Sequence, residues 1–229
     1  MISRIDELSK NWTQTQHQVQ DACAQANRDI SEVTIIAVTK TWPASDVDLL
    51  AHLGVTNVGE NRDQEAAAKK LEVQASNLVW HAIGQVQTNK VKSIVQWADA
   101  VHSIDRIDLV HALAKAMPAR NRPLDVFIQI NLDPDVRQER GGLRDGDVLE
   151  LAEKICAVPG LNLLGVMGVA PPDGDAGQAF ASLENSSLKL RQHMPSAQYI
   201  SAGMSSDYQI ALKYGATHLR LGSVILGHR

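Results

Sequence analysis

Aromatic residues are scarce in this chain of 229 residues, where Phe, Trp and Tyr together make up 4% of the sequence. A core of ordinary size must then come from Ala, Val, Leu and Ile, as it does in barrels and doubly wound α/β sheets. Cysteine is also rare, and Cys23 and Cys156 lack the spacing of a metal site or a disulfide framework. We expect both to be small buried hydrophobic residues in a reducing compartment, with no metal bound.

Strong net charge and long apolar runs are missing as well. The net charge is −4, so the chain has no electrostatic signature of a protein that binds nucleic acid or an anionic membrane. No apolar run is long enough to span a bilayer, and the N-terminus has no basic segment followed by an apolar core. The sequence therefore predicts a cytoplasmic protein with neither nucleic acid nor membrane as a partner.

The chain does contain a regular alternation of strand-like and helix-like segments. Strands are predicted at 33–40, 55–61, 78–84, 100–105, 124–131, 163–169, 198–204 and 218–226. Helices are predicted at 3–29, 45–53, 63–73, 88–97, 106–117, 147–158, 176–193 and 206–214, and a polar loop at 133–144.

Eight strands that alternate with helices, without a linker-like change in composition, predict an α/β fold of the (β/α)8 TIM barrel type. We expect one domain over residues 1–229. The last strand is expected to run on to the terminus, so that the extra N-terminal helix covers the side where an eighth helix would lie.

A single lysine ends the first predicted strand, VTIIAVTK at 33–40. Pro43 is expected to stop this strand, and Ser45 or Asp46 to cap the next helix. Ligands of α/β proteins bind at the carboxyl ends of strands, where apolar walls would lower the pKa of Lys40 and free its amine to attack a carbonyl group. The alternative is a solvated lysine that only marks the strand end.

The loops after the seventh and eighth strands, GMSSD at 203–207 and LGS at 221–223, suit an anion. Barrels commonly build a phosphate site from these two loops. Ser205 and Ser206 would open a helix with hydroxyls and free N–H groups, and Gly222 would let the backbone approach a phosphate closely. Plain helix capping is the alternative.

Other polar residues are predicted near the strand ends. A buried Arg220 needs an acceptor, which a pyridine nitrogen or a carboxylate would supply. We interpret His81 as a hydrogen-bonded core histidine rather than a metal ligand, and find nothing that favours a carboxylate pair between Glu60 and Asp105. A lysine, a phosphate cradle and a ring-facing arginine together suggest pyridoxal 5′-phosphate (PLP).

Seven stretches, in order over nearly the whole chain, resemble the pyridoxal phosphate homeostasis protein family. They are IAVTK at 36–40, GEN at 59–61 with Gln64 and Glu65, WHAIGQVQTNK at 80–90, SID at 103–105, GVAP at 168–171, SAGMSSD at 201–207 and RLGSVILG at 220–227. The chain departs from the family pattern at Ala202, where Met is usual, at Arg62, where Tyr is frequent, and in its shorter tail at 227–229.

The resemblance implies a barrel of the alanine racemase N-terminal type with the cofactor joined as an imine to Lys40. It also implies that Arg220 faces the pyridine nitrogen, that Asn61 lies near the ring and that Met204 belongs to the cofactor site. The phosphate would be held by Ser205, Ser206, Gly222 and Ser223.

The function implied by the resemblance is reversible PLP binding that buffers or delivers the cofactor, with apo forms of PLP-dependent enzymes as recipients and a monomer or weak dimer as the working form. No catalytic residue is expected. The racemases that the family resembles take a second base from an extra domain, and an arginine at the ring nitrogen weakens the electron sink of the cofactor.

Two other functions stay open from the sequence. One is a small PLP-dependent amino-acid racemase that uses Lys40 alone or with a residue such as Tyr208. The other is a cofactor-free barrel that binds a phosphorylated metabolite. Lys90 or Lys213 would offer a second docking point for the cofactor, or each is simply a solvated helix residue.

Overall fold

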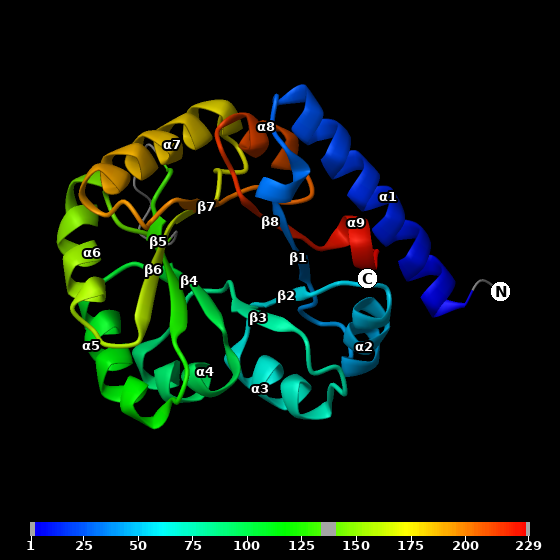
Figure 1. Cartoon of the computed structure of the whole chain (residues 1–229), viewed down its shortest axis with the longest axis horizontal. Helices are drawn as coiled ribbons and strands as arrows, with labels where there is room; N and C mark the ends of the chain where they lie inside the picture. The colour runs from blue at the N-terminus through cyan, green and yellow to red at the C-terminus, as the bar shows by residue number, and fades with distance from the viewer. Residues whose placement is uncertain (1–2, 134–140, 228–229) are drawn as a thin grey trace.

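The computed structural model of the chain describes residues 3–133 and 141–227. Parallel strands follow one another in chain order from β1 to β8, and β8 pairs with β1 to close a barrel (Figure 1). The strands are β1 (Thr34–Val38), β2 (Asn57–Glu60), β3 (Val79–Ala82), β4 (Ala100–Ile104), β5 (Leu124–Ile130), β6 (Leu161–Gly168), β7 (Tyr199–Ser201) and β8 (His218–Leu221). The predicted (β/α)8 barrel is therefore confirmed.

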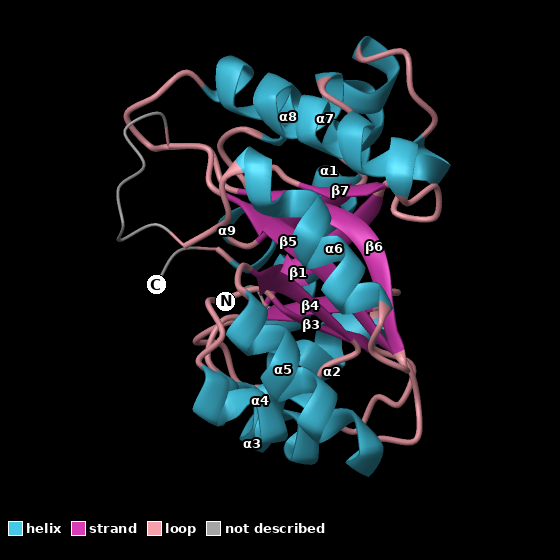
Figure 2. Ribbon diagram, turned by 90° about the vertical axis from the view of Figure 1, so that its left-hand side faces the viewer, coloured by secondary structure: helices cyan, strands magenta, loops and turns pink. Residues whose placement is uncertain are grey.

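Helices cover the outside of the strands (Figure 2). They are α1 (Arg4–Gln25), α2 (Ala44–His52), α3 (Asp63–Glu72), α4 (Val91–Trp97), α5 (Ile107–Ala116), α6 (Val148–Cys156), α7 (Ala176–His193), α8 (Tyr208–Lys213) and α9 (Ser223–Leu226). Short 3-10 turns are η1 (Ile30–Glu32), η2 (Thr88–Lys90), η3 (Met117–Ala119) and η4 (Asp145–Asp147).

Strand β5 shows how the sequence divides the core into two layers. Val126 and Ile128 belong to the large apolar cluster between the barrel and its helices. Phe127, between them, contacts the rings of His102 and His218 inside the barrel. Because successive side chains of a strand point to opposite faces, the interior of this barrel carries polar rings while its outer face stays aliphatic.

The N-terminal helix covers the gap in the helical ring, as predicted. Asn11 Nδ2 donates to the carbonyl oxygen of Ile225 at 3.1 Å, and Arg4 Nη2 donates to that of Leu226 at 3.1 Å. The prediction that the eighth strand continues to 226 is wrong, since β8 ends at Leu221 and α9 follows. This short helix packs against α1, which also contacts α8 and α2 (Figure 1).

Three local predictions are also wrong. Helix α2 has Pro43 at its N-cap without a side-chain cap, because Asp46 instead accepts hydrogen bonds from Arg4. Helix α8 begins at Tyr208, two residues later than predicted. Cys23 is buried as expected, but Cys156 is exposed at the end of α6. Of the predicted polar loop at 133–144 and of the tail, residues 134–140 and 228–229 lie outside the described residues.

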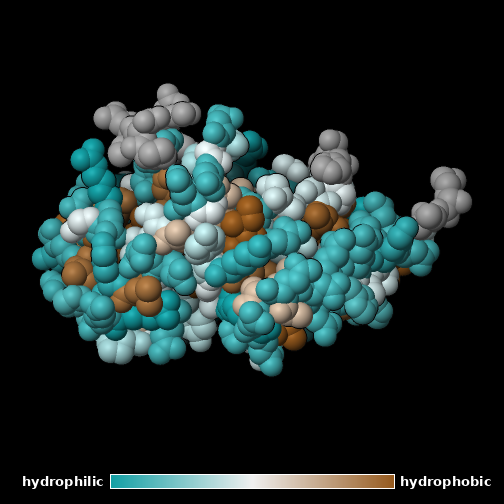
Figure 3. Space-filling model, turned by 90° about the horizontal axis from the view of Figure 1, so that it is seen from above, coloured by the Kyte–Doolittle hydropathy of each residue, from teal (hydrophilic) through white to brown (hydrophobic). Residues whose placement is uncertain are grey.

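The exposed large hydrophobic residues in the described part of the chain are Ile30, Leu71, Val79, Leu188, Tyr199 and Ile210. Figure 3 shows one face as mostly hydrophilic, with hydrophobic atoms in small separate groups. Within residues 3–133 and 141–227, no helix combines the length and the apolar character needed to cross a bilayer.

Candidate functional site

The turn after β1 presents Lys40 at the mouth formed by the carboxyl ends of the strands. Thr39 is fully buried, whereas the Lys40 side chain is exposed. The prediction that apolar walls hold this amine away from water is therefore wrong. Thr41, which follows, has a φ of 68°, a left-handed conformation that is rare for a β-branched residue.

A buried cluster of charged residues holds this turn from the outer face of the barrel. Lys69 Nζ donates to the Thr39 carbonyl oxygen at 2.8 Å, to Glu60 Oε1 at 2.6 Å and to Glu65 Oε1 at 3.1 Å. Thr39 Oγ1 donates to Glu60 at 2.6 Å, and the Thr41 N–H donates to Glu65 at 2.5 Å. The backbone is thus fastened on both sides of Lys40. We call Glu60, Glu65 and Lys69 the outer clamp.

Arg220 lies inside the barrel on β8 and is 5% exposed. Its Nη1 donates to Ser201 Oγ at 2.7 Å and its Nη2 to the Gly168 carbonyl oxygen at 2.9 Å. Among the described residues it forms no ion pair, and its Nε has no acceptor there. Burial lowers the pKa of Arg220 to about 10, and the charge of Asp207 partly offsets this effect. The alternative of a structural carboxylate pair for Arg220 is therefore not found in this part of the chain.

Register places Lys40 close to the candidate phosphate loops. Ile36 of β1 pairs with Arg220 of β8, and a Cβ atom on Gly222 would lie 3.4 Å from that of Val38, two residues before Lys40. Gly222 N–H donates to Ser205 Oγ at 3.4 Å, which joins the loops after β7 and β8.

These two loops offer several donors that the described part of the chain leaves unpaired. Among the described residues, no acceptor is found for the backbone N–H groups of Ser205, Ser206, Ser223 and Val224. Ser205 and Ser223 are half-buried, and Ser206 is exposed. The N–H of Met204, by contrast, already donates to Asp207 Oδ1 at 2.6 Å. Since α8 starts beyond Ser205 and Ser206, these two donors belong to a loop, whereas those of Ser223 and Val224 lie at the start of the short helix α9.

Asn61 leaves β2 at the same level as Lys40 leaves β1. Val38 pairs with Gly59, and Lys40 and Asn61 each follow two positions later, beyond the ends of these neighbouring strands. Asn61 is exposed and packs closely on Gly84, where a Cβ atom would lie 2.2 Å from its carbonyl oxygen.

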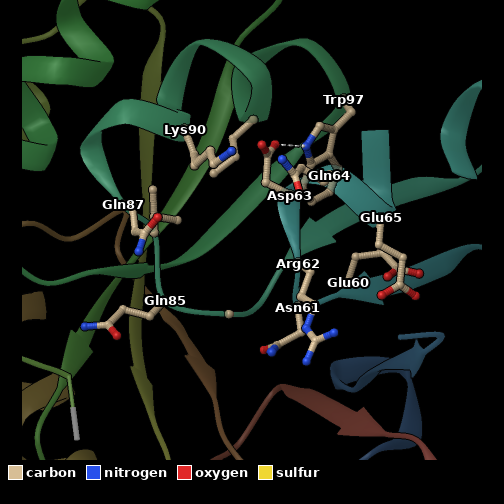
Figure 4. Close-up of a pocket in the computed structure, with 13 residues that line it drawn as sticks. Glu60, Asn61, Arg62, Asp63, Gln64, Glu65, Gln85, Gln87, Lys90 and Trp97 are labelled. Atoms are coloured by element: carbon tan, nitrogen blue, oxygen red, sulfur yellow. Dashed lines mark hydrogen bonds between the residues drawn. The ribbon is translucent and has the colours of Figure 1, made fainter. Parts of the chain in front are cut away.

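A polar cavity of about 460 Å³ adjoins Asn61 between the ends of β2 and β3. Figure 4 shows the side chains of Gln85, Gln87 and Lys90 on one side of it and those of Glu60 and Glu65 on the other. Lys90 is therefore a lining residue of this cavity rather than only a solvated one, whereas Lys213 is exposed on α8.

Hydrogen bonds, ion pairs and burial test the remaining interpretations made from the sequence. His81 is a hydrogen-bonded core histidine, as predicted, and no cluster able to hold a metal occurs among the described residues. Asp105 pairs with Arg106 at 2.6 Å while Glu60 pairs with Lys69, so these carboxylates do not form a pair with each other. Tyr208 is buried in the outer core, where α8 contacts α1, and is not a mouth residue.

Sequence reasoning missed the residues that support the site from behind. Lys69 looked like one of several helix lysines, and His102 like an ordinary strand residue. The sequence places Ser201 among the polar residues at the strand ends, but does not reveal that it is a partner of Arg220. A signal was present for Lys69, because it lies four residues after Glu65, at the spacing of a helical ion pair.

The groups at the mouth fit the chemistry of PLP. Lys40 could offer an amine to its aldehyde, and residues 203–207 and 221–224 have unpaired N–H groups and hydroxyls that could hold its phosphate. Arg220 is a buried donor with no carboxylate partner among the described residues, and would face an acceptor such as a pyridine nitrogen. When bound, the group would supply an electrophilic aldehyde and an electron-accepting ring.

Comparison with known proteins points to the same chemistry. A model described as "Alanine racemase, N-terminal domain" matches residues 11–229. The pyridoxal phosphate homeostasis protein of Mycobacterium leprae is 36% identical over 242 residues, which cover 98% of this chain and 93% of that protein. The one of Corynebacterium glutamicum is 39% identical over 210 residues, which cover 89% and 93%.

Solved structures of PLP-binding and racemase proteins are also similar to this chain. The chain is 27% identical to PipY of Synechococcus elongatus with PLP bound, with a TM-score of 0.81 and coverage of 96% of this chain and 100% of that one. Alanine racemase from Corynebacterium glutamicum is 14% identical, with a TM-score of 0.69, and is covered over 60% of its length. At this identity, the second likeness shows the fold alone.

Proposed function

The chain belongs to the pyridoxal phosphate homeostasis protein family, and on this premise we propose that it binds PLP reversibly at the barrel mouth and buffers or delivers it. The recipients would be apo forms of PLP-dependent enzymes. The single observation that carries the proposal is Arg220, a buried cation whose bonds go to a hydroxyl and a carbonyl instead of a carboxylate.

Each mouth residue has a proposed role. Lys40 would hold the cofactor as an imine, and its exposure suits a site that must load and release its ligand. Arg220 would donate to the pyridine nitrogen, and Asn61 and Met204 would lie beside the ring. Ser205, Ser206, Gly222 and Ser223 would hold the phosphate through hydroxyl and N–H donors. One barrel domain over residues 1–229 would form the whole binding unit.

We propose no catalytic turnover for this site. A racemase would need a second base across the ring from Lys40. Tyr208, the residue considered for this role, is buried against α1, where burial raises the pKa of its hydroxyl. Arg220 would also keep a pyridine nitrogen unprotonated, which would weaken the ring as an electron sink.

Borohydride reduction of the PLP-loaded protein tests the attachment. We expect one labelled peptide with the modification on Lys40, and no label in Lys40→Ala. Label on Lys69, Lys90 or Lys213 would contradict the assignment. An unmodified protein that binds inorganic phosphate but not PLP would favour the cofactor-free barrel.

A transfer assay tests the carrier role. The holoprotein is mixed with an apo PLP-dependent enzyme, and activation is compared with the rate of spontaneous release into a PLP-trapping solution. Activation faster than release supports delivery, and activation at the release rate supports buffering. Steady racemisation of alanine or serine that is lost in Lys40→Ala would overturn the non-enzymatic proposal.

A further inference from the structure

A row of hydrogen-bonded side chains crosses the interior of the barrel from the amino end of β2 to Arg220 on β8. Its members come from five strands and are Asn57, His81, His102, Ser201 and Arg220. The consecutive donor–acceptor distances are 2.9, 2.9, 2.8 and 2.7 Å. We call these five side chains the interior row.

The Arg220 end fixes half of the proton positions in the interior row. A guanidinium group only donates, so Ser201 Oγ accepts from Nη1. Among the described residues, Ser201 Oγ has no partner other than Arg220 and His102, so its hydroxyl proton finds an acceptor only in Nδ1 of His102. His102 therefore carries its own proton on Nε2.

The Asn57 end fixes the other half. Asn57 Nδ2 donates to Thr56 Oγ1 at 3.0 Å, so its Oδ1 faces His81 and accepts from Nε2 of that ring. Nδ1 of His81 is then free to accept from Nε2 of His102. Both ends thus require the same arrangement, in which each histidine is neutral and carries its proton on Nε2.

This arrangement directs every acceptor in the interior row toward the positive charge of Arg220. Burial lowers the pKa of His81 to about 3 and that of His102 well below its ordinary value. Two neutral rings stabilise the guanidinium group as oriented dipoles, whereas a protonated ring would repel it. Stacking of His102 on Phe127, with ring centroids 4.5 Å apart, fixes the plane of the middle ring.

We propose that the interior row positions Arg220 and stabilises its charge without neutralising it, so that a full positive charge faces the bound cofactor. The inference rests on the proposed function, in which Arg220 donates to the pyridine nitrogen. Ser201, His102 and His81 act through Arg220 and are positioning residues. A carboxylate at the place of Ser201 would hold the guanidinium equally well but would cancel its charge.

Nitrogen-15 NMR of the wild-type protein without cofactor tests the row directly. We expect both His81 and His102, assigned with single histidine variants, to be neutral Nε2–H tautomers at pH 7. An Nδ1–H tautomer or an imidazolium at either position overturns the proposal. This readout needs no PLP and no folded Ser201 variant.

Ser201→Ala tests the coupling to the cofactor, with Ser186→Ala as the matched control. Both serines are buried, and the Ser186 hydroxyl donates to Asp145 at 2.5 Å on the outside of the barrel. We expect Ser201→Ala to raise the PLP dissociation constant about tenfold, because a hydrogen bond to a charged group is lost, and to shift the absorption maximum of bound PLP. Ser186→Ala should change neither.

The proposal is overturned if both variants bind PLP with the affinity and spectrum of the wild-type protein. A wild-type protein that binds no PLP at all would overturn the proposed function instead. The histidine tautomers, measured without the cofactor, would then still decide whether the interior row supports Arg220.

Discussion

The ammonium group of Lys69 donates a 2.8 Å hydrogen bond to the carbonyl oxygen of Thr39, the residue directly before Lys40. The same nitrogen lies 2.6 Å from Glu60, and these side chains are 5% and 0% exposed. An exposed lysine at the mouth is therefore held by a second lysine that water does not reach. The outer clamp fixes the backbone on both sides of Lys40 through Thr39 and Thr41 and makes no bond to the Lys40 amine.

Lys69→Met should destabilise the protein by about 3–5 kcal/mol, because it leaves the buried carboxylate of Glu60 without a counter-charge. Burial already raises the pKa of Glu60, against the opposing effect of Lys69. Urea unfolding measures the loss. Lys189→Met is the control, since its pair with Asp145 is solvent-exposed and should contribute less than about 1 kcal/mol.

A second variant separates charge from packing at this position. Lys69→Met combined with Glu60→Gln should recover part of the lost stability, because no buried charge remains. Equal unfolding free energies for Lys69→Met and Lys189→Met would contradict the role given to the outer clamp.

Thr41→Gly should raise the unfolding free energy by about 1 kcal/mol, since a β-branched residue at a φ of 68° is strained and glycine is not. Asn27→Gly is the matched control. Asn27 also has a positive φ, 53°, but asparagine tolerates this conformation, so its replacement should have a smaller effect. Chemical denaturation checks both, and a lower stability of Thr41→Gly would contradict the argument.

Gly84→Ala should weaken PLP binding and cost about 1–3 kcal/mol of stability. Its new methyl group would lie 2.2 Å from the Asn61 carbonyl oxygen and push the loop after β2. Gly146→Ala is the control, because nothing lies within 4 Å of a methyl group there. It should stay within about 0.5 kcal/mol of the wild type. Binding titrations and thermal unfolding that fail to separate the two variants would refute the steric role of Gly84.

Acid should destabilise the fold from about pH 6.5 downward. Burial lowers the pKa of His81 to about 3 and that of His218 to about 4, from 6.5 in the unfolded chain. Below about pH 6.5 the unfolded state binds protons that the folded state does not. The unfolding free energy therefore decreases as the pH is lowered. Each histidine contributes about 1.4 kcal/mol per pH unit, and the raised pKa of Glu60 acts in the opposite direction.

Urea unfolding between pH 7 and pH 5 measures this slope. His218→Asn should make it shallower by the share of one histidine. A slope of zero in the wild-type protein would show that the interior rings do not stay neutral.

The alternation of segments was enough to predict the barrel, because each strand carries its own β-branched run and each helix its own apolar periodicity. The end of β8 was mispredicted since Val224 and Ile225 are β-branched residues with strand propensity, whereas in the structure they belong to α9, which packs against α1.

The sequence predicted only those residues of the candidate site that lie at the ends of predicted strands. Lys40 and Arg220 stand at such ends in the sequence. The solvent exposure of the Lys40 side chain depends on which residues pack around the end of β1. The partners of Lys69 and His102 come from other strands and helices. No local pattern encodes either property, so burial and pairing had to come from the three-dimensional structure.

The bonds from Arg4 and Asn11 on α1 to carbonyl oxygens of α9 span more than 200 residues of sequence. During synthesis on the ribosome, the apolar face of the first helix must wait for a partner that emerges at 223–226. Slow closure of such distant contacts exposes hydrophobic surface in the nascent chain. We therefore expect the early part of this polypeptide to depend on chaperones until α9 has been made.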